Sequence, residues 1–216
     1  MTLQDQKKKV RIILVTLNIC RRQMFSVTAY TAANNWKWQL ISFASINMVQ
    51  FRKESRLNFK NAEKNDIEEI VKLYRAAIRT PGCTWSVDYP NENLALKDWE
   101  RNALFCLKGD TGELIGAISI DDDKIVEELS CWTEWMKPGA ELARLVIKAD
   151  YQNQGIAGIL LGYAMQELVE RGYKSVHFLV SKTNYRAIRS YAKLNFSNCG
   201  SVDLYGEHWW CYEKEL

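Results

Sequence analysis

The chain has 216 residues, of which 47% are hydrophobic, 25% charged and 12% aromatic, with only 3 prolines. This composition is typical of a globular protein with a sizeable core, and it excludes collagen-like, low-complexity and wholly disordered chains. Residues 1–56 contain 10 Lys and Arg against 2 Asp and Glu, whereas residues 57–216 contain 19 against 24. A mildly acidic domain lacks the side chains that neutralise phosphates, so we expect no nucleic-acid partner.

The basic residues 1–56 form an N-terminal extension with two apolar stretches, residues 10–20 and 38–51. Both are shorter than the roughly 20 apolar residues that cross a bilayer, so we expect no stable membrane insertion. Three interpretations stay open. The extension is an accessory and poorly ordered segment, or a membrane-surface or regulatory segment, or the native start lies near Met48.

The domain at residues 57–216 begins with a short alternating strand at residues 57–60 and a helix that Asn65 or Asp66 caps. Pro81-Gly82 ends this helix, and a second helix is predicted over residues 91–101. Residues 103–108 and 113–120 flank a Gly/Asp-rich turn, which indicates a hairpin. We expect a solvated turn at residues 121–123 and disfavour a metal site there, because neighbouring residues at a strand end point apart.

The second half of the domain alternates strands and helices. The pattern predicts strands at residues 141–148 and 175–180, helices from about 156 to 171 and from 184 to 194, and closing strands at 202–205 and 209–212. The whole order is β-α-α-β-β-β-α-β-α-β-β, which predicts a mixed α/β domain.

The six cysteines are scattered, no two of them form a CxxC pair, and the chain has only two histidines. A structural zinc site needs close ligand pairs, so we expect no metal. Scattered cysteines suit reduced thiols in a cytoplasmic protein better than a disulfide framework.

The most informative segment is the strand-to-helix junction at residues 152–157, which reads Gln-Asn-Gln-Gly-Ile-Ala. Gly155 permits a tight turn, and the helix that follows begins with unpaired N–H groups and a positive dipole end. This combination suits a pyrophosphate. By itself the pattern is weak, and a loop glycine before an ordinary helix is the alternative.

Two further features lie around this junction. Asn184 and Tyr191 are separated by two helical turns and therefore share one helix face. The period of two predicts that Glu141 shares a strand face with Leu145 and Ile147.

Residues 57–216, which carry these motifs, resemble the GCN5-related N-acetyltransferase (GNAT) superfamily. The resemblance rests on the strand at 141–148, on the junction, which matches the pattern Q/R-x-x-G-x-G/A, and on residues 184–196, which match N-x-x-A/S-x-x-x-Y-x-K-x-G-F. Asn195 stands where this family usually has Gly, a mild departure because Asn also accepts a left-handed backbone. The resemblance implies a mixed, mostly antiparallel central sheet flanked by helices, with a splayed strand pair that binds the cofactor.

The resemblance also implies acetyl-CoA binding, with no metal. Backbone amides of the junction would hold the pyrophosphate, the strand residues would pair with the pantetheine arm, and an N–H near Ile147 would steady the oxyanion. Asn184 would contact the cofactor arm. The implied cofactor-binding residues are Leu145, Val146, Ile147, Gln152, Asn153, Gln154, Gly155, Ile156, Ala157 and Asn184.

Acetyl transfer to an amine needs two proton movements. An alkylamine is protonated at neutral pH, so a base must deprotonate it, and Glu141 is the candidate base. The alternative is that Glu141 is only a strand-end carboxylate, paired with Arg144 or with a helix. Tyr191 is the candidate acid for the leaving thiolate, with a packing tyrosine as the alternative. The amine attacks directly in a ternary complex, so no cysteine nucleophile is expected.

The remaining polar and aromatic residues receive structural interpretations. We expect Trp132, Trp135, Trp209 and Trp210 to serve core or rim packing, with an aromatic substrate pocket as the alternative, and His177 to be a satisfied structural histidine. Arg186 and Arg189 are expected to be solvated, with contact to the adenosine phosphate of the cofactor as the alternative. The acceptor, a small-molecule or peptide amine, would be shaped by the first two helices, the loop at residues 85–90 and the final hairpin. A non-catalytic acyl-CoA-binding module is the alternative function, and a homodimer stays open.

Overall fold

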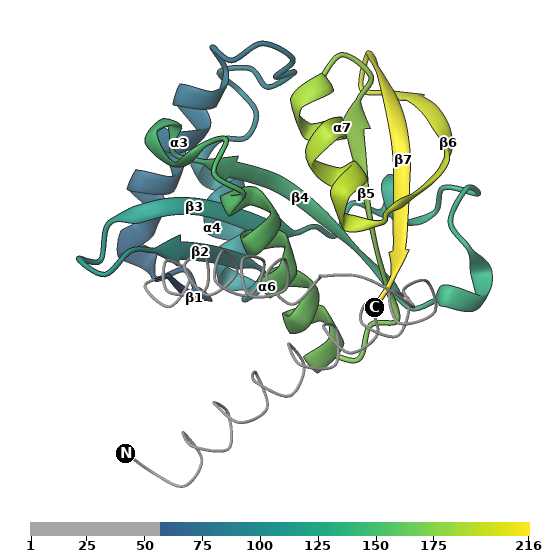
Figure 1. Ribbon diagram of the computed structural model, residues 1–216, viewed down its shortest axis with the longest axis horizontal. Helices are drawn as coiled ribbons and strands as arrows, with labels where there is room; N and C mark the ends of the chain where they lie inside the picture. Colours follow the sequence, from purple (N-terminus) through teal and green to yellow (C-terminus); the bar gives the residue numbers. More distant parts are fainter. Residues whose placement is uncertain (1–56) are drawn as a thin grey trace, which may run out of the picture. The chain divides into compact units, whose positions relative to one another are not determined.

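The structure, a computed structural model, describes residues 57–216, so the predictions for residues 1–56 lie outside the described residues (Figure 1). The described chain is built on a seven-stranded sheet with the order β1-β2-β3-β4-β5-β7-β6. Neighbouring strands are antiparallel except β4 and β5, which are parallel. The strands are β1 (Asn58–Asn61), β2 (Leu104–Lys108), β3 (Leu114–Ile120), β4 (Gly139–Ile147), β5 (Ser175–Ser181), β6 (Ser197–Leu204) and β7 (Glu207–Glu215).

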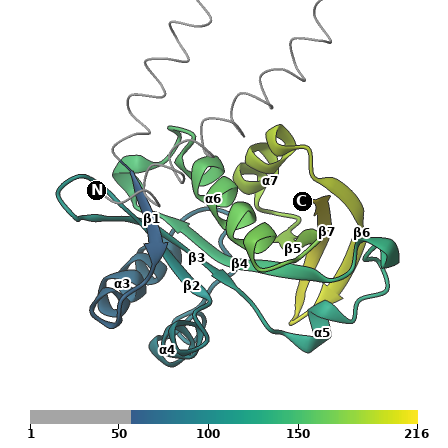
Figure 2. The ribbon, with the colours of Figure 1, turned by 90° about the horizontal axis from the view of Figure 1, so that it is seen from below.

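Helices cover both faces of the sheet. Figure 2 shows α3 (Ile67–Ala77) and α4 (Glu92–Glu100) on one face, and α6 (Ile156–Glu170) and α7 (Tyr185–Tyr191) on the other. The apolar side of α3 packs with Val146 of β4, whereas α6 buries Leu160, Leu161 and Leu168 against the opposite face. Each fully buried side chain of this kind stabilises the fold by ~1.5–3 kcal/mol relative to an exposed one.

The predicted fold class and element order are confirmed, with differences at several boundaries. β4 begins at Gly139 rather than at residue 141, the last two strands are longer than predicted, and α7 ends at Tyr191 in a 3₁₀ turn over Ala192–Leu194. Asn195 has the left-handed backbone expected of it, with φ +57°.

The prediction of a solvated turn at residues 121–123 is wrong in part. Asp123 caps a short helix that the sequence pattern did not indicate, α5 (Lys124–Glu127), by accepting from the Ile125 amide at 3.0 Å. The Asp121 carboxylate is mostly buried and forms an ion pair with Arg144. A buried cation therefore fixes one end of this turn, while Asp122 stays exposed.

A β-bulge interrupts β4. Ala117 pairs with Val146 and Ser119 pairs with Ala143, so two residues, Arg144 and Leu145, lie opposite one residue of β3. Arg144 takes a positive φ of +55°. The expectation that Glu141 shares a face with Leu145 and Ile147 is therefore wrong, because the extra residue reverses the alternation.

The bulge places two sets of side chains on opposite faces of β4. Paired residues of neighbouring strands point to the same face, so Glu141 lies with Ala143 and Val146 on the face that α3 and α4 cover. Leu142 and Ile147 lie on the face that α6 covers.

The Arg144 side chain, only 1% exposed, links β4 to two other segments. Its guanidinium lies 2.8 Å from Asp98 of α4, a carboxylate with no exposed surface, and forms a second ion pair with Asp121. Arg101 also pairs with Asp98, at 2.7 Å. Breaking such a buried pair is strongly destabilising, because the removal of one partner leaves the other charge buried and uncompensated.

We predict that Arg144→Met lowers the free energy of unfolding by ~3–5 kcal/mol, since it strands Asp98 and Asp121 without their shared cation. Urea denaturation of the full chain measures this. The control is Glu68→Gln, which breaks an exposed pair with Lys72 and should leave the unfolding midpoint nearly unchanged. Equal midpoints for the Arg144→Met protein and the wild type would contradict the prediction.

Candidate functional site

The two strands at the centre of the sheet separate. β4 pairs with β5 only at Gly139–Ser175, Ala140–Val176 and Glu141–His177. Beyond this point β4 stays paired with β3 up to Ile147, and β5 stays paired with β7 up to Ser181. The gap between the strands in Figure 1 follows from this loss of pairing, and it leaves one backbone edge of β4 available to a ligand.

A large cavity of about 1060 Å³ occupies this opening. Three groups of residues line it: the strand residues 142–147, the junction with the start of α6, and α7 with the end of β5. The loop between α3 and α4 also contributes, through residues 80–85. The cavity therefore combines an apolar strand edge with polar backbone at its junction end.

The start of α6 has the backbone that the sequence predicts. Gly155 is the N-cap with φ +80°, and a Cβ at this position would meet nothing within 4 Å. No side chain caps the first turn of this 15-residue helix. Its initial amides and its positive dipole end are therefore suited to an anion.

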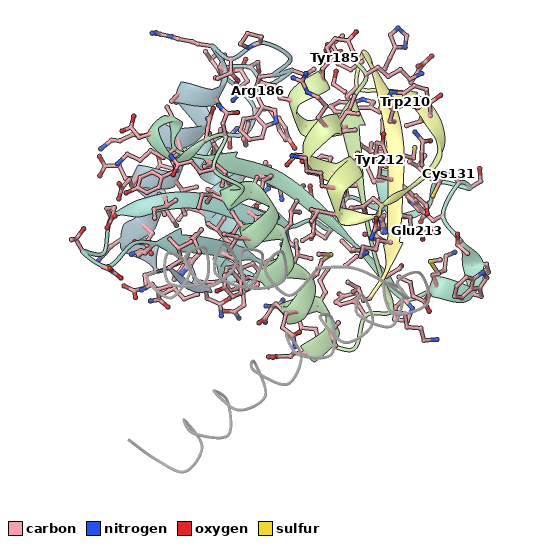
Figure 3. All side chains as sticks on the ribbon, viewed as in Figure 1. Cys131, Tyr185, Arg186, Trp210, Tyr212 and Glu213 are labelled. Atoms are coloured by element: carbon pink, nitrogen blue, oxygen red, sulfur yellow. The ribbon has the colours of Figure 1, made fainter. Side chains whose placement is uncertain are left out.

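Two polar side chains strengthen the anion-binding character of the junction. Gln152 donates from Nε2 to the carbonyl oxygen of Ile147 at 2.8 Å, which ties the junction to the end of β4. Arg186, labelled at the start of α7 in Figure 3, donates to Oε1 of Gln152 at 2.8 Å. The expectation that Arg186 is merely solvated is therefore incomplete, because it carries a positive charge beside the junction and, like Arg189, lines the cavity.

The structure brings most of the predicted cofactor-binding residues to this cavity. Gln154 is the exception: it does not line the cavity, and its Nε2 donates to the carbonyl oxygen of Asp150 at 2.7 Å. The predicted residues that line the cavity are Leu145, Val146, Ile147, Gln152, Asn153, Gly155, Ile156, Ala157 and Asn184.

Asn184 joins two sides of the cavity. Its side chain accepts from the Ala187 amide at 3.1 Å and so caps α7. A Cβ on Gly82 would lie 2.9 Å from the Cα of Asn184, so the α3–α4 loop approaches α7 closely only because residue 82 is glycine. The sequence predicts a role for residues 85–90 of this loop in shaping the acceptor site, whereas the part at residues 80–84, which also lines the cavity, was expected only to end a helix.

Tyr191 lines the cavity from the end of α7 and is 9% exposed. Its ring packs on Phe178 of β5, with centroids 4.5 Å apart. Burial raises the pKa of its phenol to about 12. Tyr191 therefore carries its proton at neutral pH.

Glu141 does not line this cavity. It lies at the last β4–β5 pair, one residue before Leu142, and points to the face that α3 and α4 cover. Burial, followed by the charge of Asp121, raises the pKa of its carboxyl to about 9. At neutral pH Glu141 therefore holds a proton in the free protein.

The other singled-out residues are mostly packed. Trp132 is buried, donates from Nε1 to the carbonyl oxygen of Val126 at 2.7 Å and stacks on the ring of His177. His177 lies 3.2 Å from a carboxylate oxygen of Glu127, but neither of its ring nitrogens has a hydrogen-bond partner among residues 57–216, so the prediction of a satisfied histidine is wrong. Trp209 lines the cavity, so it is a functional candidate rather than a packing residue alone, and Trp135 is exposed.

Three of the cysteines gather in a cluster that the scattered spacing did not predict. Cys131, Cys199 and Cys211 lie around Val126 and Trp132. Burial, followed by the neighbouring Cys131 thiol, raises the pKa of Cys211 to about 12, and burial followed by Glu213 raises that of Cys199 to about 11. Cys199 and Cys211 are therefore protonated thiols at neutral pH, which makes them poor nucleophiles.

Within residues 57–216, no helix is long and apolar enough to cross a membrane. In the same part of the chain, no group of three or more His, Cys, Asp and Glu side chains is arranged to hold a metal ion.

Comparisons with known proteins agree with this geometry. The sequence model described as the acetyltransferase (GNAT) family matches residues 68–196. An uncharacterised N-acetyltransferase of Archaeoglobus fulgidus is 25% identical over 144 residues, which cover 63% of this chain and 90% of that protein.

Solved structures share the fold at low identity. The structure of yncA from Salmonella typhimurium with its cofactor acetyl-CoA has a TM-score of 0.59 and 17% identity, covering 74% of this chain and 94% of that one. The ribosomal-protein-S18-alanine N-acetyltransferase of Escherichia coli has a TM-score of 0.56 and 19% identity, covering 74% and 93%.

The raised pKa of Glu141 gives a stability prediction. The folded state holds this proton up to pH about 9, whereas the unfolded chain releases it near 4.5, so Glu141 lowers stability as the pH rises between these values. Glu141→Gln removes this loss, so the Tm of the variant minus that of the wild type should grow from pH 5 to 9. A Tm difference that does not change with pH would contradict a buried, protonated Glu141. The control is Glu128→Gln, which changes a carboxylate at an exposed position beside α5.

Proposed function

The chain belongs to the acetyltransferase (GNAT) family, and from this premise we propose that it transfers an acetyl group from acetyl-CoA to a primary amine of a small molecule or peptide. The observation that carries the proposal is the opened edge of β4, which leads directly to the uncapped start of α6. An acyl-CoA has the two features that this arrangement matches, an extended amide-bearing arm and a pyrophosphate.

The described residues fit that ligand. Amides of residues 152–157 would bind the pyrophosphate, helped by the positive charge of Arg186, and the open space at Gly155 leaves room for the close approach. The edge residues Leu145, Val146 and Ile147 would pair with the arm as another strand does. Asn184, already fixed as the cap of α7, would contact the arm from the other side.

Bound acetyl-CoA supplies an activated acyl carbon, and this chain's residues would move the protons. Glu141, protonated in the free protein, would release its proton to water as the ammonium of the acceptor arrives, and as a carboxylate it would then accept a proton from that ammonium, directly or through water. The amine nitrogen would then bond to the acyl carbon, the carbon–sulfur bond would break, and the second proton that the nitrogen loses would return through water to the oxygen of Tyr191, which gives up its own proton in this step. An amide near Ile147 would donate to the developing oxyanion, and the Tyr191 phenol would give its proton to the sulfur.

A non-catalytic acyl-CoA-binding module is the second candidate, because Glu141 lies outside the cavity that would hold the cofactor. The release of free thiol from acetyl-CoA in the presence of amines separates the two. The buried thiols Cys106 and Cys211 support a reducing, cytoplasmic location, and a homodimer remains an open proposal.

We predict that Gly155→Val weakens acetyl-CoA binding at least tenfold, because a β-branched residue does not tolerate φ +80° and its side chain would occupy the open space at the junction. Isothermal titration calorimetry measures the dissociation constant. Gly162→Ala is the control, since this position lies inside α6 and a Cβ there meets open space. Failure of the wild type to bind acetyl-CoA would overturn the proposed function.

We predict that Tyr191→Phe lowers kcat by roughly 10²-fold or more while the dissociation constant of acetyl-CoA changes little, because the variant keeps the packing on Phe178 and loses only the acid. Steady-state thiol release with a saturating amine measures this. Tyr185→Phe, at an exposed position on the same helix, should retain full activity. Full activity of the Tyr191→Phe enzyme would assign Tyr191 to packing alone.

A further inference from the structure

An acidic cluster lies on the α3–α4 side of the sheet, at the point where β4 and β5 are still paired. We call it the acidic cleft and define it by four carboxylates, Asp121, Asp123, Glu127 and Glu141, which come from the loop after β3, from α5 and from β4. The negative charges of Asp121, Asp123 and Glu127 each raise the pKa of Glu141. The Glu127 and Asp121 side chains are 34% and 13% exposed and Glu141 is 7% exposed, so Glu141 is the most buried of these three carboxylates.

Glu141 forms the inner end of the acidic cleft and is the observation that points to a ligand. Only 7% of its surface is exposed, yet its Oε2 has no hydrogen-bond partner among the described residues. A buried polar atom without a partner costs free energy, so native structures rarely retain one without a function. An ammonium group would supply both the hydrogen bond and the charge that this carboxyl lacks.

The cations present do not balance the cleft. Arg144 is the positive charge that acts on Glu141, but its guanidinium is already shared between Asp98 and Asp121. Glu127 lies beside His177, and Asp123 accepts from the Tyr205 hydroxyl and the Ile125 amide. Negative charge therefore remains at the outer part of the cleft, while the Glu141 carboxyl at its inner end, protonated in the free protein, has no cation of its own.

Two tyrosines flank the acidic cleft. Tyr89, from the α3–α4 loop, is 45% exposed, and Tyr205, from the turn between β6 and β7, is 60% exposed. Both interact electrostatically with Glu141 and with each other. Aromatic faces beside carboxylates favour alkylammonium groups.

We propose that the acceptor is an aliphatic amine with a second positive charge, and that the acidic cleft binds it. The inference rests on the proposed function. The reacting ammonium lies at Glu141, at the end of the opened strand pair, and the second ammonium lies nearer solvent at Asp123 and Glu127, between Tyr89 and Tyr205. Both a diamine and lysine amide carry two ammonium groups and therefore fit this arrangement.

The first experiment compares acceptors on the full chain. Thiol release from acetyl-CoA is measured with 1,4-diaminobutane, with n-butylamine as the analogue that lacks the second charge, and with lysine amide. We expect kcat/KM for 1,4-diaminobutane to exceed that for n-butylamine at least tenfold, with lysine amide showing which source of the two charges fits better. Equal values for 1,4-diaminobutane and n-butylamine would overturn the proposal.

The second experiment removes one charge from the acidic cleft. Asp123→Asn keeps a residue that caps α5 as well as Asp does, so the fold should be retained. The ratio of kcat/KM for diamine over monoamine should fall toward one. Glu128→Gln, which removes the same charge from an exposed position next to α5, should leave the ratio at its wild-type value. An unchanged ratio in the Asp123→Asn enzyme would overturn the assignment of the second ammonium.

Direct binding separates failure of the inference from failure of the proposed function. Calorimetric titration of 1,4-diaminobutane and n-butylamine into the chain saturated with coenzyme A reports selectivity without turnover. Selective diamine binding with no thiol release would retain the acidic cleft and remove the transferase activity. Thiol release with no selectivity between the two amines, in rate or in binding, would support the transferase activity and overturn the binding of the acceptor by the acidic cleft.

Discussion

The described domain depends on one constraint: β4 must remain paired with β3 along its length while it leaves β5 after three residues. The β4 bulge at Arg144 and Leu145 meets this constraint, because it bends the strand and increases its local twist. A positive φ at a residue other than glycine is unfavourable by itself, so surrounding contacts must hold it. The pairs of Arg144 with Asp98 and Asp121 provide those contacts and connect the bulge to α4 and to the loop after β3.

Because of the same bulge, the two faces of β4 contribute to different parts of the site. Without the extra residue, Glu141 would point to the same side as Ile147, toward α6. With it, the β4 edge and the start of α6 form one side of the site, and Glu141 faces the segments that would receive the acceptor. Two substrates can thereby approach the end of the strand pairing from opposite sides, which direct transfer in a ternary complex requires.

The sequence predicted the parts of the site that local backbone chemistry encodes. Gly155 and Asn195 have positive φ values that few residues tolerate, so each could be recognised from its type and its position at a helix end. The β4 bulge could not be recognised, because Arg144 gives no local signal and its partners Asp98 and Asp121 lie 46 and 23 positions away. The acidic cleft was missed for the same reason, since charges that a turn would leave in solvent are drawn together by contacts between distant segments.

The protonation of Glu141 connects acceptor binding with catalysis. With a pKa of about 9, its carboxyl is an acid in the free protein at neutral pH and is not ready to act as a base. Entry of an ammonium would place a positive charge against it and favour ionisation, so the proton would leave as the acceptor arrives. Under the proposed function, a cationic acceptor would then generate the base that deprotonates it, whereas an amine that binds uncharged would meet a carboxyl that is still protonated. The charge of the acceptor would therefore determine both its affinity for the acidic cleft and the competence of Glu141.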